Sequence, residues 1–355
     1  MTSSNPGPCV GAHLVGSVPL KSADDVFLTA ARDLGDRLER IPDGETGDRI
    51  EWIHFQLPII AATPGMTSVD FVFPDEIELP PDVPREGSLF APESEEATAG
   101  LAFGNLRYAD EAIASYQRFR ELKEAGEIPD HMRFQVSLPT ALAVMSWFAP
   151  EARPAVEPAY EGALLREVEK IVSAIPHDQL AIQFDLCIEV FMLEDYPLLP
   201  PWFDDVLGGI LDRVEAHANA VPDDVELGFH LCYGDWKGQR QAEPTDAGNL
   251  VLLANAVTDR ITRPVAWIHL PVPRGMDAGP WAPPLADLKL RDETRLYLGL
   301  VHGPDSLEES RELAELCAQY VPEFGVATVC GIGRQPEEAV EPILAVHREL
   351  AAPVD

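Results

Sequence analysis

The sequence predicts a (β/α)8 (TIM) barrel with insertions in its loops. Eight short runs of β-prone residues alternate with helical patterns over the 355 residues, as in an α/β fold. Polar and metal-capable residues gather directly after these runs, where the C-terminal ends of barrel strands build a site. A doubly wound open sheet is the alternative, but it would prefer a G-x-G-x-x-G turn after its first strand. The segment GAHLVGSVP at residues 11–19 lacks that spacing.

The predicted strands are short and spread along the chain. Helical patterns separate them: residues 160–174 carry an apolar stripe, and residues 306–321 open with the capping box Ser306-x-x-Glu309. The eight strands are expected at residues 10–15, 38–41, 133–137, 180–186, 225–232, 265–270, 295–301 and 324–330.

We expect a single barrel domain over residues 1–355, with no internal repeat. Its least regular stretch is a Pro- and acid-rich insertion near residues 74–99, which fits either a linker or an excursion within the domain. A second Pro-rich segment, residues 271–284, also lies between regular elements.

The composition argues against several classes of protein. The chain has 60 Asp and Glu against 26 Lys and Arg, a formal charge of −34, so we expect no nucleic-acid partner and no membrane partner. Five widely spaced cysteines, an odd number, argue against a disulfide framework. No apolar run is long enough for a membrane helix, and the N-terminus lacks the basic start of a secretory signal. We therefore expect a soluble, cytoplasmic protein, and homo-oligomer formation stays open.

The strongest chemical signal is the motif HLCYG at residues 230–234, at the end of the fifth strand. Residues i and i+2 of a strand share a face, so His230 and Cys232 would both face the barrel axis near its top. This pair suits Zn²⁺, although an isolated pair is more often a buried cysteine beside a hydrogen-bonded histidine. Cys330, in the motif CGIGR at residues 330–334, would add a third ligand. Three protein ligands and one open position are the pattern of catalytic zinc.

Acidic and polar side chains surround this predicted metal site. Gln183 and Asp185 end the fourth strand on one face, and Glu189 follows in the loop. A rim of carboxylates would favour a cationic group on the substrate, such as an ammonium; the alternative is an acidic protein with acidic loops. Asp185 is the stronger candidate, because an unpaired charge within an apolar strand is costly. The expected substrate-binding residues are Gly16, Ser17, Asp43, Glu45, Gln183, Glu189 and Trp236.

Two histidines near strand ends are candidates for catalysis beside Asp185. His269 ends the sixth strand, and His302 follows the seventh. Either could steady a leaving group as an acid, an assignment that rests on position only.

The motifs HLVGSVP, SLPT, QFD, HLCYGD and CGIGR together resemble the cobalamin-independent methionine synthase superfamily. The likeness is to its catalytic barrel and to single-barrel members that lack the duplicated N-terminal barrel. The same superfamily includes uroporphyrinogen decarboxylase-like proteins. The resemblance spans residues 12–334, and the HxCYG…CG pair is its most specific part.

The resemblance implies roles for the matching residues. His230, Cys232 and Cys330 would hold Zn²⁺, Asp185 would contact the amino group of a thiol amino acid, and the Gly16-Ser17 segment would hold its carboxylate. Methionine synthases carry a glutamate ligand after the sixth strand, and PVAWIHLPVPRG has none. Either His269 replaces it, or the site has three protein ligands.

Three hypotheses of function follow. The first is a zinc-dependent methyl- or alkyltransferase that activates a small thiol as a zinc-bound thiolate, with that thiol and an alkyl donor as its partners. The second is a metal-free lyase or decarboxylase on the same barrel, with Asp43, Glu45 and Asp185 transferring protons. The third is a binding protein without catalytic activity.

Overall fold

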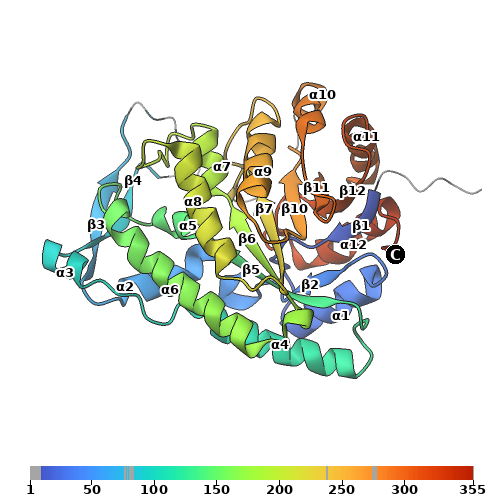
Figure 1. The fold of residues 1–355 in the computed structure, drawn as a ribbon, viewed down its shortest axis with the longest axis horizontal. Coiled ribbons are helices and arrows are strands. Elements are labelled where there is room, and N and C mark those ends of the chain that lie inside the picture. Colours follow the sequence, from blue (N-terminus) through green and yellow to red (C-terminus); the bar gives the residue numbers. More distant parts are fainter. Residues whose placement is uncertain are drawn as a thin grey trace, which may run out of the picture.

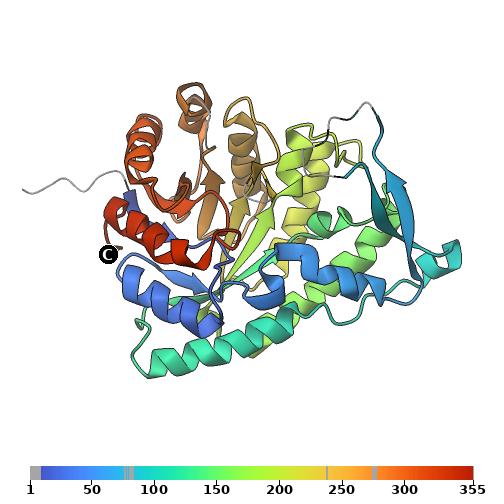
Figure 2. The same cartoon turned by 180° about the vertical axis from the view of Figure 1, so that it is seen from behind.

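The computed structural model describes residues 9–75, 77, 79, 84–236, 239–273 and 278–354. Within these ranges, one curled sheet of eight parallel strands is surrounded by helices (Figures 1 and 2). Its strands are β1 (Cys9–His13), β2 (Arg40–Pro42), β5 (Arg133–Pro139), β6 (Leu180–Leu186), β7 (Glu226–Leu231), β10 (Trp267–Pro271), β11 (Arg295–Val301) and β12 (Phe324–Thr328).

The strand order is β1-β12-β11-β10-β7-β6-β5-β2, the cyclic order of a (β/α)8 barrel. At the closing edge, a parallel bridge joins Ala12 of β1 to Leu38, just before β2, and the Ala12 amide donates a hydrogen bond to the Arg37 carbonyl at 2.8 Å. The predicted (β/α)8 fold is confirmed. β6 and β11 occupy their predicted ranges, whereas β1 and β12 each end two residues early because the apolar sequence continues into the loops above the barrel.

Helices alternate with these strands. The longer ones are α1 (Ala23–Leu34), α4 (Tyr108–Glu124), α6 (Arg153–Ala174), α8 (Val206–Asn219), α9 (Gly248–Arg260), α11 (Leu307–Cys317) and α12 (Val340–Leu350). Short helices are α2 (Leu57–Ala61), α3 (Glu95–Ala99), α5 (Ala141–Met145), α7 (Ile188–Leu193) and α10 (Ala278–Trp281), with 3₁₀ turns η1 (Gly47–Arg49), η2 (Trp52–Gln56), η3 (His177–Gln179), η4 (Pro283–Asp287) and η5 (Glu337–Ala339). In the described part of the chain, no helix combines the length and apolarity that crossing a membrane requires.

The predicted capping box at Ser306 is wrong. Ser306 does precede α11, but its φ and ψ of −92° and 8° are not the extended values of a capping residue, and its side chain bonds no helix amide. Its hydroxyl instead donates to the Gly303 carbonyl at 2.8 Å and accepts from the His302 amide at 3.3 Å. Ser306 therefore holds the loop after β11.

An antiparallel hairpin projects from the barrel, at the left of Figure 1. It consists of β3 (Met66–Val72) and β4 (Glu86–Pro92), so the segment expected to be an irregular insertion contains a strand and helix α3. Phe90 of β4 fastens the hairpin to the barrel: its amide donates to the Trp147 carbonyl and its carbonyl accepts from the Ala149 amide, both at 2.9 Å. A smaller hairpin, β8 (Asp235–Trp236) with β9 (Gln239–Arg240), follows β7. The single-domain organisation stays a prediction.

Large aromatic rings beside glycines fill the barrel interior. A Cβ atom on Gly228 of β7 would lie 2.0 Å from the Trp267 ring, and one on Gly325 of β12 would lie 2.3 Å from the Tyr297 ring. The Arg40 guanidinium lies over Trp267, 4.2 Å from the ring centroid. The neighbouring strands therefore need glycine where the ring of the adjacent strand takes the space.

Replacing Gly228 by alanine should destabilise the fold by roughly 1–3 kcal/mol, because the buried Trp267 ring has no free volume into which to move. Urea unfolding would measure the change in the free energy of unfolding. Gly104→Ala is the control, since an added Cβ there meets nothing within 4 Å. Equal losses in the two variants would contradict this packing.

Candidate metal centre and its cavity

Three metal-capable side chains meet at the C-terminal ends of the strands. His230 belongs to β7, Cys232 directly follows it, and Cys330 follows β12. One ligand atom from each residue lies within 4.8 Å of those of the other two. His230 and Cys232 are buried, and Cys330 is partly exposed. The side chains thus converge as the two motifs predict, while metal binding itself stays a prediction.

The donor set fits zinc. The Cys232 and Cys330 sulfurs lie 3.8 Å apart. Two sulfurs bound at ~2.3 Å to one tetrahedral zinc ion would be separated by about the same distance. The Gly234 amide donates to the Cys232 sulfur at 3.3 Å, a contact that favours a thiolate. Without a metal, contact with the Cys187 side chain and burial raise the pKa of Cys232 well above its usual value.

A chain of hydrogen bonds orients His230. The Nε2 atom of His269 lies 3.0 Å from the Thr328 carbonyl oxygen, and the Nδ1 atoms of His269 and His230 lie 2.7 Å apart. Burial lowers the pKa of His269 to about 3 and that of His230 well below its usual value, so both rings are neutral. A carbonyl only accepts, so His269 Nε2 carries the proton, and its Nδ1 accepts from His230 Nδ1–H.

The Nε2 atom of His230 is therefore left without a proton. It is buried and has no hydrogen-bond partner among the described residues. A buried acceptor without a partner beside two cysteines suits a metal ligand. Both ring nitrogens of His269, by contrast, take part in these hydrogen bonds. His269 is therefore placed to orient His230 and has no nitrogen left to bind a metal itself.

The loop after β1 packs directly on the loop that carries Cys330. The Gly333 amide donates to the Ser17 hydroxyl at 3.3 Å, and the Ile332 amide donates to the Ser17 carbonyl at 2.8 Å. A Cβ on Gly331 would lie 2.3 Å from the Ser17 Oγ atom, so glycine is required for this approach. Gly16 and Ser17 both line the cavity beside Cys330.

Two carboxyl groups face the metal site. Asp185 at the end of β6 and Glu45 after β2 both line the cavity. Burial raises the pKa of Glu45 to about 7 and that of Asp185 well above its usual range, and each feels the charge of a neighbouring carboxylate. Gln183 orients Asp185 by donating to its Oδ1 at 2.9 Å, and does not itself belong to the cavity lining.

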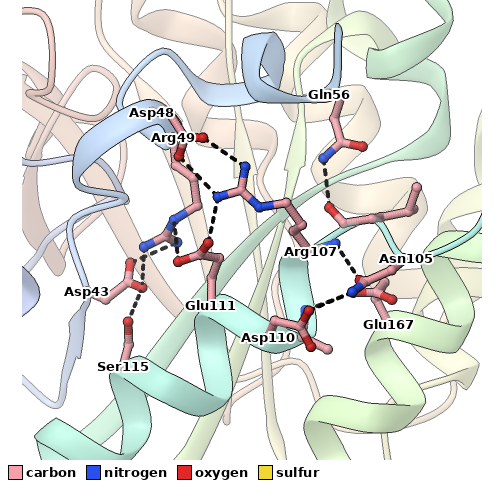
Figure 3. Close-up of polar contacts among 12 residues, drawn as sticks. Asp43, Asp48, Arg49, Gln56, Asn105, Arg107, Asp110, Glu111, Ser115 and Glu167 are labelled. Carbon is pink, nitrogen blue, oxygen red and sulfur yellow. Dashed lines mark hydrogen bonds and ion pairs between the residues drawn. The ribbon is translucent and has the colours of Figure 1, made fainter. Parts of the chain in front are cut away.

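Asp43 lies in an ion-pair network outside this cavity (Figure 3). Its carboxylate pairs with Arg49 at 2.8 Å and accepts hydrogen bonds from the Ser115 hydroxyl at 2.7 Å and the Glu45 amide at 2.9 Å. These contacts use both Asp43 oxygens. Asp43 therefore shapes the turn that presents Glu45, which has an unusual φ of 47°.

The other predicted site residues lie apart from the metal site. Glu189 is fully buried in α7 and His302 lies beside the Val272 carbonyl at 2.9 Å; neither belongs to the described cavity lining. The backbone of Trp236 is in β8, but its side chain lies outside the described residues. The substrate-binding and catalytic roles of these residues stay predictions.

One cavity of about 400 Å³ begins at the metal site and extends to the β3–β4 hairpin. It contains residues that the sequence analysis did not assign. Arg334 lines the cavity and lies 3.7 Å from Asp235. Its place in the CGIGR motif could have identified it as a candidate site residue. Cys187, two residues after Asp185, also lines the cavity. Trp52 and Arg153 carried no local signal, because distant segments bring them there.

The burial of Glu189 predicts that the free energy of unfolding falls as the pH rises. Burial raises the pKa of Glu189 from 4.5 to about 7, so its stability contribution is complete below pH 4.5 and is lost as the pH rises toward 7. Relative to Glu189→Gln, the wild type should lose up to about 3 kcal/mol of unfolding free energy between pH 5 and 8. Urea unfolding of both proteins at each pH would measure this. The exposed Glu169→Gln is the control, and a difference for Glu189→Gln that stays constant with pH would contradict the prediction.

Comparisons with known proteins agree with this architecture. No protein-family model matches the sequence, and no curated protein matches it. Among solved structures, the chain is similar to a B12-independent methionine synthase from Shewanella sp. W3-18-1 in complex with selenomethionine, with a TM-score of 0.56, 12% identity and 97% of each chain covered. It is also similar to a putative vitamin-B12-independent methionine synthase from Listeria monocytogenes, with a TM-score of 0.54, 12% identity, and 98% of this chain and 100% of that chain covered. At this identity the similarity establishes the shared fold.

Proposed function

We propose that this protein is a zinc-dependent methyl- or alkyltransferase that acts on a small thiol. The observation that carries the proposal is the cluster of His230, Cys232 and Cys330 at the end of a large cavity. Such a set leaves a fourth zinc position for a substrate. The fold shared with two B12-independent methionine synthases supports the same reading.

The residues divide the work by position. A zinc ion held by this cluster would supply a substrate thiolate at neutral pH, since a free thiol has a pKa of about 8.5. His269 keeps His230 in the tautomer whose Nε2 atom faces the cluster. A cavity of about 400 Å³ would allow two substrates to lie side by side, and such positioning would lower a bimolecular barrier. Attack of the thiolate sulfur on the alkyl carbon would form the C–S bond of a thioether and break the bond from that carbon to the donor, which would leave with the electron pair of that bond.

Asp185 and Glu45 suit a thiol that carries an ammonium group. Both carboxyl groups are protonated more readily than usual, because they are buried and repel each other. A cation between them would relieve that repulsion. Ser17 lines the same cavity against the loop of Cys330, and its hydroxyl would be available to another polar group of the same substrate.

A metal-free lyase or decarboxylase is the second candidate. The raised pKa values of Glu45 and Asp185 favour it, because carboxyl groups that titrate near neutrality serve as proton donors and acceptors. The unpaired His230 Nε2 atom beside two thiols favours alkyl transfer instead. Proton transfer by the carboxyl groups would not require the cluster of His230, Cys232 and Cys330.

Zinc stoichiometry tests the proposal. The wild type should hold one ion per chain after exposure to Zn²⁺, and Cys330→Ala and Cys232→Ser should lose it. His269→Ala should still hold one ion with an affinity lower by about 10–100-fold, because His269 orients a ligand without being one. Elemental analysis and chelator competition would measure both quantities.

Cys317→Ala is the matched control, because Cys317 is a buried cysteine of α11 outside the cavity lining. Wild-type protein without zinc would sink the proposal. Full turnover by Cys232→Ser would favour the metal-free reaction.

The carboxyl pair predicts a preference among thiols. Zinc-loaded protein should bind cysteamine at least about tenfold more tightly than 2-mercaptoethanol, which lacks the ammonium group. Asp185→Asn should remove most of this preference and leave the affinity for 2-mercaptoethanol unchanged. Calorimetric titration would measure the dissociation constants, and an undiminished preference in Asp185→Asn would contradict the assignment.

A further inference from the structure

The part of the cavity that lies away from the metal ligands is apolar. Its wall is built by the β3–β4 hairpin, by η2 and by the segments after β5 and β6, and it includes Phe71, Leu89, Trp52, Trp147, Phe191 and Leu199. A volume of about 400 Å³ falls within the range of about 300–1,000 Å³ that is typical of sites for drug-sized ligands. A thiol of a few atoms fills little of this space, so the remaining volume would accommodate a second, larger and hydrophobic molecule.

Arg153 places an unpaired positive charge in the same cavity. The residue is only 3% exposed, and its Nε atom donates to the Phe148 carbonyl at 3.2 Å. Its guanidinium carbon lies 5.7 Å from the centroid of the Trp202 ring. No carboxylate oxygen of the described residues lies within ion-pair distance of it, and the nearest acidic influence is the exposed Glu151. Burial lowers the pKa of Arg153 to about 10, so the group still carries its charge at neutral pH.

An unpaired buried guanidinium is costly unless an anion joins it. Helix α6 begins at Arg153 without a side-chain cap, so the positive end of the helix dipole adds to the same potential. Arg153 lines the cavity, and the guanidinium N–H groups that it does not use on Phe148 are donors suited to an anion.

Carboxyl groups predominate at the metal end of the cavity. Asp185, Glu45 and Asp235 line that end, and an arginine there, Arg334, lies 3.7 Å from Asp235. Glu51 also lines the cavity, but its side chain is 64% exposed and lies 3.8 Å from His54. An anionic group is therefore favoured at Arg153 and disfavoured beside Asp185.

We propose that the alkyl donor is a hydrophobic anion, with its apolar body against the aromatic wall and its carboxylate, sulfonate or phosphate group on Arg153. This assignment to the donor rests on the proposed thiol alkylation, because the thiol takes the metal end. The donor would enter with its anionic group away from the cluster of His230, Cys232 and Cys330.

Binding of octanoate to the zinc-free wild type tests the site apart from any zinc chemistry. Octanoate should bind at least about tenfold more tightly than octanamide, which has the same shape without the charge. Affinity should rise by up to about fourfold per methylene from butanoate to octanoate. Arg153→Met should bind octanoate at least about tenfold more weakly, and Arg153→Lys should retain part of the affinity. Calorimetry would measure all of these constants.

Arg166→Met is the matched control, because Arg166 is an exposed arginine of the same helix that bonds to the Gly162 and Phe103 carbonyls. It should bind octanoate as the wild type does. Equal affinity for octanoate and octanamide would overturn the proposal without recourse to any variant. On zinc-loaded protein, cysteamine and octanoate should bind together, and mutual exclusion would overturn the assignment to the donor. Octanoate binding to a protein that never takes up zinc would sink the thiol chemistry and leave the anion site standing.

Discussion

The candidate site depends on one chain of hydrogen bonds that joins three strands of the sheet, β12, β10 and β7, with β11 lying between β12 and β10. The Thr328 carbonyl of β12 fixes the proton of His269 on β10, and His269 in turn fixes the proton of His230 on β7. Two neutral rings in series leave a single unpaired nitrogen lone pair, and it belongs to the residue beside Cys232 and Cys330. A carbonyl at the end of the chain matters because it cannot donate, so the tautomers have no second solution. The barrel supplies this order, since parallel strands bring their C-terminal ends to one rim.

The same rim separates two chemical environments within one cavity. The strand ends supply ionisable groups, which gather at the metal site, whereas the loops and the β3–β4 hairpin supply aromatic and aliphatic wall. Phe90 fastens that hairpin to the segment before α6, the helix that begins with Arg153. The hairpin that forms part of the apolar wall is therefore hydrogen-bonded to the segment that leads into the helix of the buried cation.

Local patterns were sufficient for much of the fold and for the centre of the site. Buried parallel strands read as continuous apolar runs, which is why β6 and β11 match their predicted ranges. The alternation of a strand placed His230 and Cys232 on one face, and the closing glycine motif placed Cys330 near them. Interactions between distant residues could not be predicted from local patterns: Asp43 accepts a hydrogen bond from Ser115, 72 residues away, and lies outside the lining of the cavity that holds Cys330. The β3–β4 hairpin was not predicted, because its strands are only half-buried and lack an apolar run.

The cluster of His230, Cys232 and Cys330 beside the two carboxyl groups favours the proposed thiol chemistry over proton transfer alone. A proton-transfer enzyme needs carboxyl groups and a substrate, but it has no use for a histidine held in one tautomer opposite two sulfurs. A thiol alkyltransferase needs both features, because one end of its acceptor must reach the metal while the other is held in place. Gln183 holds the acceptor-binding carboxyl group in position. Its side-chain amide donates hydrogen bonds to Asp185 and to the Val15 carbonyl of the loop after β1. Asp185 is therefore connected to the backbone segment that carries Ser17. Asp185 and the candidate metal ligands His230 and Cys232 are thus each held by hydrogen bonds to the barrel and its loops.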